Sequence, residues 1–265
     1  MNNRPIKHFT IAFFLFYLPL KSMGWGVIGH RVVGEIADSY LKPSTRLEIK
    51  KILGNETLAM ASTWADFVRS EAAYNYLNNW HYINLNRGYS HAQMEDFLKI
   101  DTSTNAYSKI NLLMKELKNK ELAMGKKRMY LRMLIHLVGD IHQPLHSGNK
   151  SDRGGGEIKV TWFDRQSNLH WVWDAEMIDF QQLSYTEYAN SINETTDSQR
   201  DDWTKGGLSS WLFDAYRLSD VIYASAKSGD KLDSKYNYDH ITIVNGQLLK
   251  GGVRLAALLN QLFAS

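Results

Sequence analysis

Hydrophobic residues recur every three or four positions along most of this chain, which is the spacing of one buried helix face. The first such stretch, residues 28–41, is apolar at Ile28, Val32, Val33, Ile36, Ala37 and Tyr40. The same spacing predicts further helices over 44–53, 57–69, 104–119, 127–142, 168–182, 185–196, 206–228 and 240–263. Only four of the 265 residues are proline, which suits long helices because proline interrupts them.

Two short stretches favour extended structure instead. Residues 157–163 alternate in the manner of a strand, and residues 79–86 are rich in strand-forming residues. A glycine-rich polar loop is expected over 147–156, and Ser44 is expected to cap the second helix. No repeat or linker interrupts the pattern, so the sequence predicts one mostly α-helical domain with a small β element.

The first 24 residues are typical of a secretory signal peptide. Arg4 and Lys7 precede an apolar run that is too short to span a membrane, and Gly24 is a suitable residue for cleavage. We expect cleavage after Gly24, a mature domain over residues 25–265 that begins at Trp25, and no stable membrane anchor.

Charge and cysteine content restrict the chemistry of the mature domain. Loss of the signal removes three of the 31 Lys and Arg residues and leaves them equal in number to the 28 Asp and Glu residues. No basic tract indicates a nucleic-acid surface, so anion binding would need local charge such as a metal. The chain has no cysteine, which removes thiolate ligands and favours a secreted or periplasmic bacterial protein without disulfides.

The segment from His136 to His146 carries the strongest candidate chemistry. His136 and Asp140 are four residues apart and therefore share one face of a helix. A proline two residues before His146 should end that helix and place His146 on the following turn. His170 and Asp174 repeat the spacing of four. Zinc binds imidazole nitrogen and carboxylate oxygen, so the two segments predict zinc sites.

Upstream candidates are weaker, because each has an ordinary structural alternative. Signal cleavage would free the amine of Trp25, whose pKa near 8 permits metal binding, and His30 follows; both also suit a buried tryptophan and a capping histidine. Asp66 is expected in the last turn of its helix, where a carboxylate is unfavourable unless it meets a cation. Arg69 would pair with Asp66 or with a phosphate. His81 has bulky apolar neighbours, which also suit a hydrogen-bonded core histidine.

Together these motifs resemble those of the zinc-dependent single-strand nucleases. These are secreted enzymes of fungi, plants and bacteria that also act as 3'-nucleotidases and share a mostly helical superfamily with the zinc phospholipases C. The matching motifs are Trp25-Gly-x-x-Gly-His30, Trp64-Ala-Asp66-x-x-Arg69, Trp80-His81-Tyr-Ile-Asn84, His136-x-x-Gly-Asp140-x-His-Gln-Pro-Leu-His146, Asp152-Arg-Gly-Gly155 and Asn168-Leu-His170-x-Val-Trp-Asp174. The resemblance covers essentially the whole mature chain and implies the fold of that superfamily.

The resemblance implies three zinc ions. The first would be held by Asp66, His81, His136 and Asp140. The second would be held by the amine and carbonyl of Trp25, by His30 and by Asp140, which is shared. The third would be held by His146, His170 and Asp174.

The resemblance also implies roles for residues beside the metals. Asp66 and Arg69 are the expected catalytic residues, and Arg69 would also bind substrate phosphate. Tyr82 matches a position that stacks on a base, and Asn84 one that hydrogen-bonds it. Gly156 stands where the family commonly has asparagine, a difference that affects substrate contacts rather than zinc ligands.

The implied activity is hydrolysis of single-stranded DNA and RNA, and of 3'-nucleotides, to leave 5'-phosphorylated nucleic-acid products. We expect a monomer without a protein partner. Two alternatives stay open: a phospholipase C-like lipid phosphodiesterase and a non-catalytic zinc-binding protein. The spacing from Trp25 to His30, and Asp174 where the lipases resemble this pattern with glutamate, favour the nuclease. Asp66 and Arg69 argue against a structural site, which needs no open position.

Overall fold

Helices dominate the computed structural model of the chain, which describes residues 24–263. The helices of eight or more residues in regular α form are α1 (Val27–Ser39), α2 (Pro43–Leu53), α5 (His91–Ile100), α6 (Ala106–Leu117), α7 (Met124–Asp140), α10 (Tyr185–Ile192), α11 (Asp197–Thr204), α12 (Gly207–Ser225) and α13 (Ser234–Leu262). Apart from Gly24, the predicted signal peptide lies outside the described residues. The predicted mostly α-helical fold with a small β element is confirmed.

Shorter helical pieces connect the long helices and carry much of the site described below. They are α3 (Leu58–Ala61), α4 (Trp64–Phe67), η1 (Val68–Ser70), η2 (Ala72–Trp80), η3 (Pro144–Ser147), α8 (Leu169–Trp171), η4 (Val172–Glu176) and α9 (Met177–Asp179). Among them, η1, η2 and η3 are 3₁₀ helices and η4 is a π-helix.

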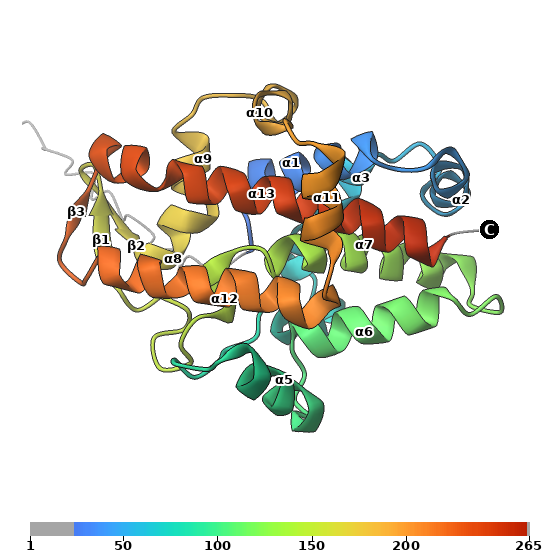
Figure 1. Cartoon of the computed structure of the whole chain (residues 1–265), viewed down its shortest axis with the longest axis horizontal. Coiled ribbons are helices and arrows are strands. Elements are labelled where there is room, and N and C mark those ends of the chain that lie inside the picture. Colours follow the sequence, from blue (N-terminus) through green and yellow to red (C-terminus); the bar gives the residue numbers. More distant parts are fainter. Residues whose placement is uncertain (1–23, 264–265) are drawn as a thin grey trace, which may run out of the picture.

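The core is built around the second half of α7, in which residues 133–140 are all buried. Helices α1, α6 and α13 pack against α7, and α1 also packs closely on α13. That close approach needs glycine at position 252, because a Cβ there would lie 2.5 Å from the Cβ of Ile36. In Figure 1, α12 and α13 run along the long axis of the molecule. The carboxyl end of α7 is therefore enclosed by other helices inside the protein.

A three-stranded sheet lies at one end of the long axis (Figure 1). Strand β1 (Lys159–Trp162) pairs antiparallel with β2 (Arg165–Asn168), with Lys159 opposite Asn168. It pairs in parallel with β3 (Lys231–Leu232), with Thr161 opposite Lys231. The strand predicted over 157–163 is thus present in its middle part, and α8 leaves the sheet directly after β2.

The helix predicted over 57–69 is wrong as a single element, because the chain breaks into α3, α4 and η1. The break follows from a contact distant in sequence: the carbonyl of Ser62 bonds Nδ1 of His136 at 2.6 Å instead of continuing a helical ladder. As a result, Asp66 lies in the first turn of α4 and not in the last turn of a long helix, as predicted.

Several other boundaries differ for identifiable reasons. Helix α2 begins at Pro43, a favoured first residue, so Lys42 and not Ser44 is its N-cap. The helix predicted over 168–182 divides into α8, η4 and α9. Asn79 and Trp80 end η2, and extended backbone follows: Ile83 N–H donates to the His146 carbonyl at 2.8 Å.

Two regular α-helices escaped prediction although the sequence contains their start signals, and the 3₁₀ helix η2 was not predicted either. Helix α5 begins with a capping box between Ser90 and Gln93, and α11 with one between Thr196 and Gln199. Both helices have weak apolar faces, and α11 buries none of its residues. Within residues 24–263, no helix combines the length and hydrophobicity needed to cross a bilayer.

Candidate metal centre

The end of α7 presents the predicted histidine and carboxylate on one buried face. His136 and Asp140 are both fully buried, with His136 Nε2 3.2 Å from Asp140 Oδ2. The α-helix ends at Asp140, and Pro144 begins η3, which holds His146. The predicted helix end and following turn are therefore present.

Asp140 is the centre of a first cluster of ligand atoms that come from four parts of the chain. Its Oδ1 lies 3.3 Å from His30 Nε2, and its Oδ2 lies 3.1 Å from His81 Nδ1. Asp66 approaches from α4, with Oδ1 4.0 Å from His136 Nε2. Two overlapping groups, His30 with Asp66 and His136, and His81 with His136 and Asp140, each have ligand atoms within 4.8 Å of one another. This geometry could hold more than one cation.

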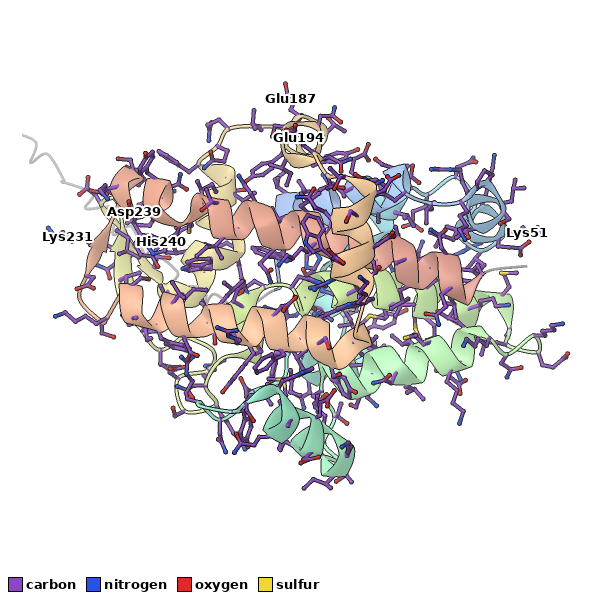
Figure 2. All side chains as sticks on the ribbon, viewed as in Figure 1. Lys51, Glu187, Glu194, Lys231, Asp239 and His240 are labelled. Carbon is purple, nitrogen blue, oxygen red and sulfur yellow. The ribbon has the colours of Figure 1, made fainter. Side chains whose placement is uncertain are left out.

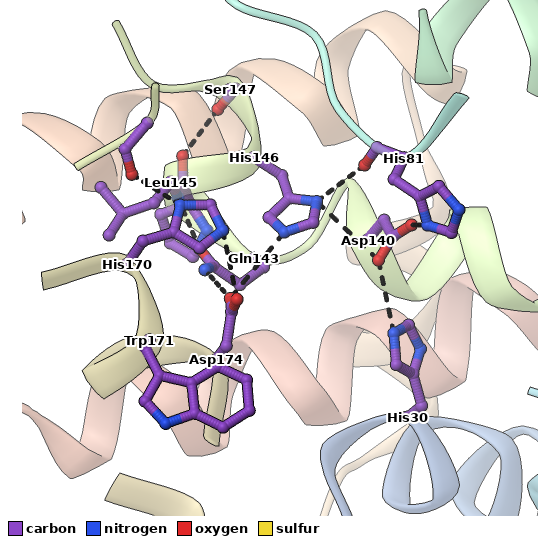
Figure 3. Close-up of polar contacts among 12 residues, drawn as sticks. His30, His81, Asp140, Gln143, Leu145, His146, Ser147, His170, Trp171 and Asp174 are labelled. Carbon is purple, nitrogen blue, oxygen red and sulfur yellow. Dashed lines mark hydrogen bonds and ion pairs between the residues drawn. The ribbon is translucent and has the colours of Figure 1, made fainter. Parts of the chain in front are cut away.

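A second cluster lies beside the first, as Figure 3 shows. His170 Nε2 is 3.1 Å and His146 Nε2 3.8 Å from the carboxylate of Asp174. Asp174 lies in the π-helix η4, an irregularity that is frequent at functional sites. His146 also joins the clusters, because its Nδ1 is 3.8 Å from Asp140 Oδ1.

Backbone carbonyls fix the orientation of three of these histidines. Nδ1 of His136, His146 and His170 lies 2.6, 2.7 and 2.7 Å from the carbonyl oxygens of Ser62, His81 and Gly154 respectively. Since a carbonyl can only accept, each Nδ1 carries the hydrogen and each Nε2 keeps its lone pair in the neutral ring. Metal-bound histidines in proteins are typically held in this way, by a hydrogen bond from the ring nitrogen that does not face the metal.

Two carboxylate oxygens also fit a bound cation. Asp140 Oδ1 lies 3.3 Å from His30 Nε2, and Asp174 Oδ2 lies 3.1 Å from His170 Nε2. Both oxygens are buried, and neither contact has hydrogen-bond geometry. A cation between the oxygen and the ring nitrogen would satisfy such a buried oxygen. Oxygen and imidazole donors without thiolate suit zinc among the common metals.

The electrostatics of the first cluster favour positive charge. Burial opposes protonation of His136, but Asp140 and Asp66 outweigh it and raise its pKa to about 9. Burial likewise opposes ionisation of Asp140, yet His136 and its neighbours hold the pKa of that carboxyl well below its usual range. A cation bound at this position would displace the His136 proton, so its binding would depend on pH.

In the second cluster, burial keeps the histidine His146 neutral and makes the carboxylate of Asp174 harder to ionise. Burial lowers the pKa of His146 to about 4, and burial raises the pKa of Asp174 to about 6 against the attraction of His170. The His146 ring is therefore neutral at pH 7, with its Nε2 lone pair directed at Asp174. A divalent cation bound here would add positive charge beside the buried Asp174 carboxylate.

The start of the described chain reaches the first cluster. Trp25 is fully buried, and Gly26 N–H donates to the Asp174 carbonyl at 2.6 Å. A Cβ built on Gly24 would overlap Asp140 Oδ1 and lie 2.8 Å from His30 Nε2. The peptide that precedes Trp25 therefore occupies space between two candidate ligands.

The two candidate catalytic side chains lie together at the edge of the first cluster. Arg69 Nη1 is 3.3 Å from Asp66 Oδ1, and the Asp66 side chain is 5% exposed against 16% for Arg69. Burial raises the pKa of Asp66, but His136 and the other histidines lower it further than burial raises it. Asp66 is thus ionised, and the guanidinium of Arg69 keeps some access to solvent.

A small pocket opens beside the second cluster. Its volume is about 90 Å³, and its lining residues are Tyr82, Asn84, Leu145, Arg153 and His170. The pocket thus joins both candidate base-contact residues to a candidate metal ligand. Gly156 lies in the adjoining turn, where its N–H donates to the Arg153 carbonyl at 3.3 Å.

Comparison with known proteins assigns the chain to a family. A model of the S1/P1 nuclease family matches residues 25–264. The chain belongs to the S1/P1 nuclease family. Nuclease S1 of Aspergillus oryzae is 31% identical to it over 97% of this chain and 96% of its own length. Endonuclease 2 of Arabidopsis thaliana is 29% identical over 96% of this chain and 95% of its own length.

As a member of the S1/P1 nuclease family, the protein is a hydrolase that acts on phosphodiester bonds. The predicted family resemblance is confirmed. A crystal structure of alpha-toxin from Clostridium perfringens matches with a TM-score of 0.46 and 14% identity, over 92% of this chain and 66% of the toxin chain. That likeness is too low to bear on fold or function.

One side chain absent from the sequence-based predictions supports the second cluster of this S1/P1 nuclease. Gln143 is fully buried; its Nε2 donates to Asp174 Oδ1, and its Oε1 accepts from Leu145 N–H at 2.5 Å (Figure 3). One amide thus orients a carboxylate ligand and fixes the turn that holds His146. The sequence offered one signal for this role: Gln143 is a polar residue directly before Pro144, inside the segment from His136 to His146.

Replacing Gln143 with leucine is expected to lower kcat/KM by about 10- to 100-fold, the usual effect of removing the hydrogen-bond partner of a metal ligand. Metal content should fall by up to one ion per chain, because Asp174 loses its orienting donor. Gln247→Leu is the matched control: it also removes a buried amide, one that donates to the His142 carbonyl. Thermal unfolding separates lost stability from lost metal. Equal activity and metal content in Gln143→Leu and the native protein would refute the role.

Proposed function

We propose that this nuclease is a secreted zinc-dependent endonuclease that hydrolyses single-stranded DNA and RNA to 5'-phosphorylated products and also acts as a 3'-nucleotidase. One observation carries the proposal: two joined clusters of histidine and aspartate lie beside a pocket lined by Tyr82 and Asn84. Names of relatives such as Nuclease S1 support nucleic acid as the substrate class.

The proposed cofactors are three zinc ions. Their ligands would be Asp66, His81, His136 and Asp140 for the first; Trp25, His30 and Asp140 for the second; and His146, His170 and Asp174 for the third. When bound, these ions would supply Lewis-acid charge to the phosphate and acidify water. Support comes from the buried oxygens of Asp140 and Asp174, which face histidine nitrogens, and from the absence of cysteine in the chain.

Asp66 and Arg69 would act directly on the reacting groups. The Asp66 carboxylate would accept a hydrogen bond from the attacking water and orient it toward phosphorus. Arg69 would donate hydrogen bonds to the non-bridging phosphate oxygens, for which its planar fork is well suited. The water oxygen would bond to phosphorus and lose a proton to solvent while the P–O3' bond breaks. The departing O3' would take up a proton to become a 3'-hydroxyl, and the phosphate would remain on the 5' side.

Preference for a single strand follows from the recessed site. The candidate ligands are buried, so a phosphate must enter among them while a neighbouring base turns into the pocket. A stiff duplex cannot do both, whereas a flexible strand can stack a base on Tyr82 and hydrogen-bond it to Asn84.

The proposal includes processing and location. Residues 1–24 would be removed as a signal peptide, and residues 25–265 would form the active domain. The enzyme would be secreted or periplasmic in a bacterium, and would act as a monomer without a protein partner or membrane anchor.

The deciding experiment compares single-stranded and duplex DNA of one sequence as substrates of the mature protein, together with metal analysis. We expect three zinc ions per chain and strong preference for the single strand. Equal rates on both would remove the single-strand proposal. Hydrolysis of phosphatidylcholine instead of DNA would indicate a lipid phosphodiesterase. Full metal content without hydrolysis of any phosphoester would indicate a non-catalytic zinc-binding protein.

Replacing Tyr82 with alanine tests the base site separately. Loss of one stacked base should raise KM by about 5- to 150-fold, since stacking contributes about 1–3 kcal/mol per base. Metal content should stay unchanged, because Tyr82 is no proposed ligand. Tyr238→Ala, a change of a 78% exposed tyrosine on α13, is the control. An unchanged KM in Tyr82→Ala would exclude Tyr82 from substrate binding.

A further inference from the structure

A group of aromatic and basic side chains lies on the surface formed by η2 and the first turns of α7. We call it the α7–η2 surface and define it by Tyr74, Tyr76, Lys126, Lys127 and Tyr130. Tyr76 is 54% exposed. The Tyr76 hydroxyl lies 3.9 Å from Sδ of Met129, so η2 packs beside this part of α7. Lys126 and Lys127 precede Tyr130 by four and three residues and therefore share its face of the helix. Lys126 Nζ lies 5.2 Å from the centre of the Tyr130 ring.

The two lysines of this surface are available to an anion. Among the described residues, no carboxylate oxygen lies within 4.0 Å of either Lys126 or Lys127. The next basic residues of α7 are engaged within the protein: Arg128 Nε donates to the Ile52 carbonyl, and Arg132 pairs with Glu56 at 2.8 Å. Positive charge on this surface therefore comes from the lysines.

Ring contacts connect the α7–η2 surface to the metal centre along two routes. Through η2, the ring of Tyr76 lies 5.8 Å from that of Trp80, the residue directly before His81. Through α4, the ring of Tyr74 lies 5.4 Å from that of Trp64, two residues before Asp66. The residues of the surface thus pack against the segments that carry candidate ligands.

The length of this connection exceeds one nucleotide. At a rise of about 1.5 Å per residue, Lys126 lies roughly 15 Å along the α7 axis from His136. Lys109 Nζ, 4.8 Å from the centre of the Trp80 ring, adds a basic group on the way. A chain bound at the metal centre can therefore reach the lysines only if it extends over several units.

We propose that the α7–η2 surface binds the part of a single-stranded nucleic acid that extends beyond the metal centre. Bases would stack on Tyr76 and Tyr130, and phosphates would pair with Lys126 and Lys127. Aromatic rings that reach the surface beside lysines, as exposed Tyr76 and half-buried Tyr130 do, bind single strands without sequence preference. A duplex keeps its bases stacked inside and would reach only the lysines. The inference rests on the proposed nuclease function and adds a dependence on substrate length.

The test uses the zinc-loaded protein and a fluorescent, phosphorothioate-linked 20-mer of thymidine as a hydrolysis-resistant probe. The variant Tyr76→Ala/Lys126→Ala/Lys127→Ala should bind it at least about 10-fold more weakly at low salt. Its plot of log affinity against log salt should be less steep by about 1.4, or about 0.7 for each lysine lost. Its kcat/KM on a dinucleotide should equal that of the native protein.

The matched control is Tyr238→Ala/Lys231→Ala, which removes a tyrosine and a lysine remote from this surface. Figure 2 labels Lys231 at the end of the molecule opposite Lys51. Lys51 stands on α2, whose Ile52 carbonyl accepts the bond from Arg128, so the α7–η2 surface lies at that other end. The control should bind the 20-mer as the native protein does.

The outcomes separate this inference from the proposed function. Unchanged probe affinity and salt slope in the triple variant would overturn the inference, even if the protein cleaves DNA. The inference would also be overturned if the triple variant lost kcat/KM on the dinucleotide by the same factor as it lost affinity for the 20-mer. The three residues would then act through the metal centre. Tighter binding to anionic lipid vesicles than to the 20-mer would assign the surface to a membrane instead. Absence of cleavage with normal probe binding would refute only the nuclease proposal.

Discussion

Asp140→Asn is expected to lower kcat/KM by at least about 10³-fold, the upper range for loss of one electrostatic stabiliser of the transition state. Asp140 contacts His30, His81, His136 and His146 within 3.8 Å. An amide has nearly the same shape but carries no charge, so the first and second proposed zinc ions would lose their shared ligand. Metal analysis should find fewer than two ions per chain.

The control for this change is Asp214→Asn, which alters a carboxylate that pairs with Arg254 and lies outside the proposed ligand set. It should keep the full metal content even if thermal stability falls. Retention of three ions and normal turnover by Asp140→Asn would show that Asp140 is no bridging ligand, and the assignment of the first two sites would have to be abandoned.

Extra residues left before Trp25 are expected to remove one metal ion and to reduce activity by about 100-fold or more, at least the upper effect of disturbing a group that supports a metal ligand. A free amine with a pKa near 8 can bind a metal, whereas a peptide nitrogen cannot do so at neutral pH. The preceding peptide also obstructs the site, because Gly24 lies against His30 and Asp140.

The control for this extension appends the same residues after Ser265 instead, where metal content and activity should stay normal. Proteolytic removal of the extra residues before Trp25 should restore both. The count of metal ions per chain and the rate on single-stranded DNA are measured before and after removal. Full activity with the extension still attached would eliminate the Trp25 amine as a ligand.

The sequence alone determined the parts of the site that depend on local geometry. Spacing of four residues puts His136 and Asp140 on one helix face, and proline at 144 places His146 in the following 3₁₀ turn. The helical character of the chain was equally readable, because the period of buried residues repeats over each long helix. Family motifs then related these segments to others far away in the sequence.

Only the tertiary structure decided what depends on contacts between distant segments. The bond from His136 to the Ser62 carbonyl divides a predicted helix and moves Asp66 into the first turn of α4. The amide of Gln143 is recognisable as a support for Asp174 only when η3 and η4 are packed together. No periodic pattern encodes such bonds, since their partners are dozens of residues apart.

The α7–η2 surface could not be predicted from the sequence for the same reason, because it depends on packing between distant segments. The sequence has no long basic tract, yet packing brings Tyr76 of η2 beside the part of α7 that carries two lysines, while the next arginines of α7 are already bonded within the protein. Charge and stacking surface are properties of what remains exposed after folding. The sequence thus encodes directly which residue types can bind metal and how they are spaced along one helix. Long-range packing decides which of these side chains come together, how they are oriented and which surface residues stay exposed.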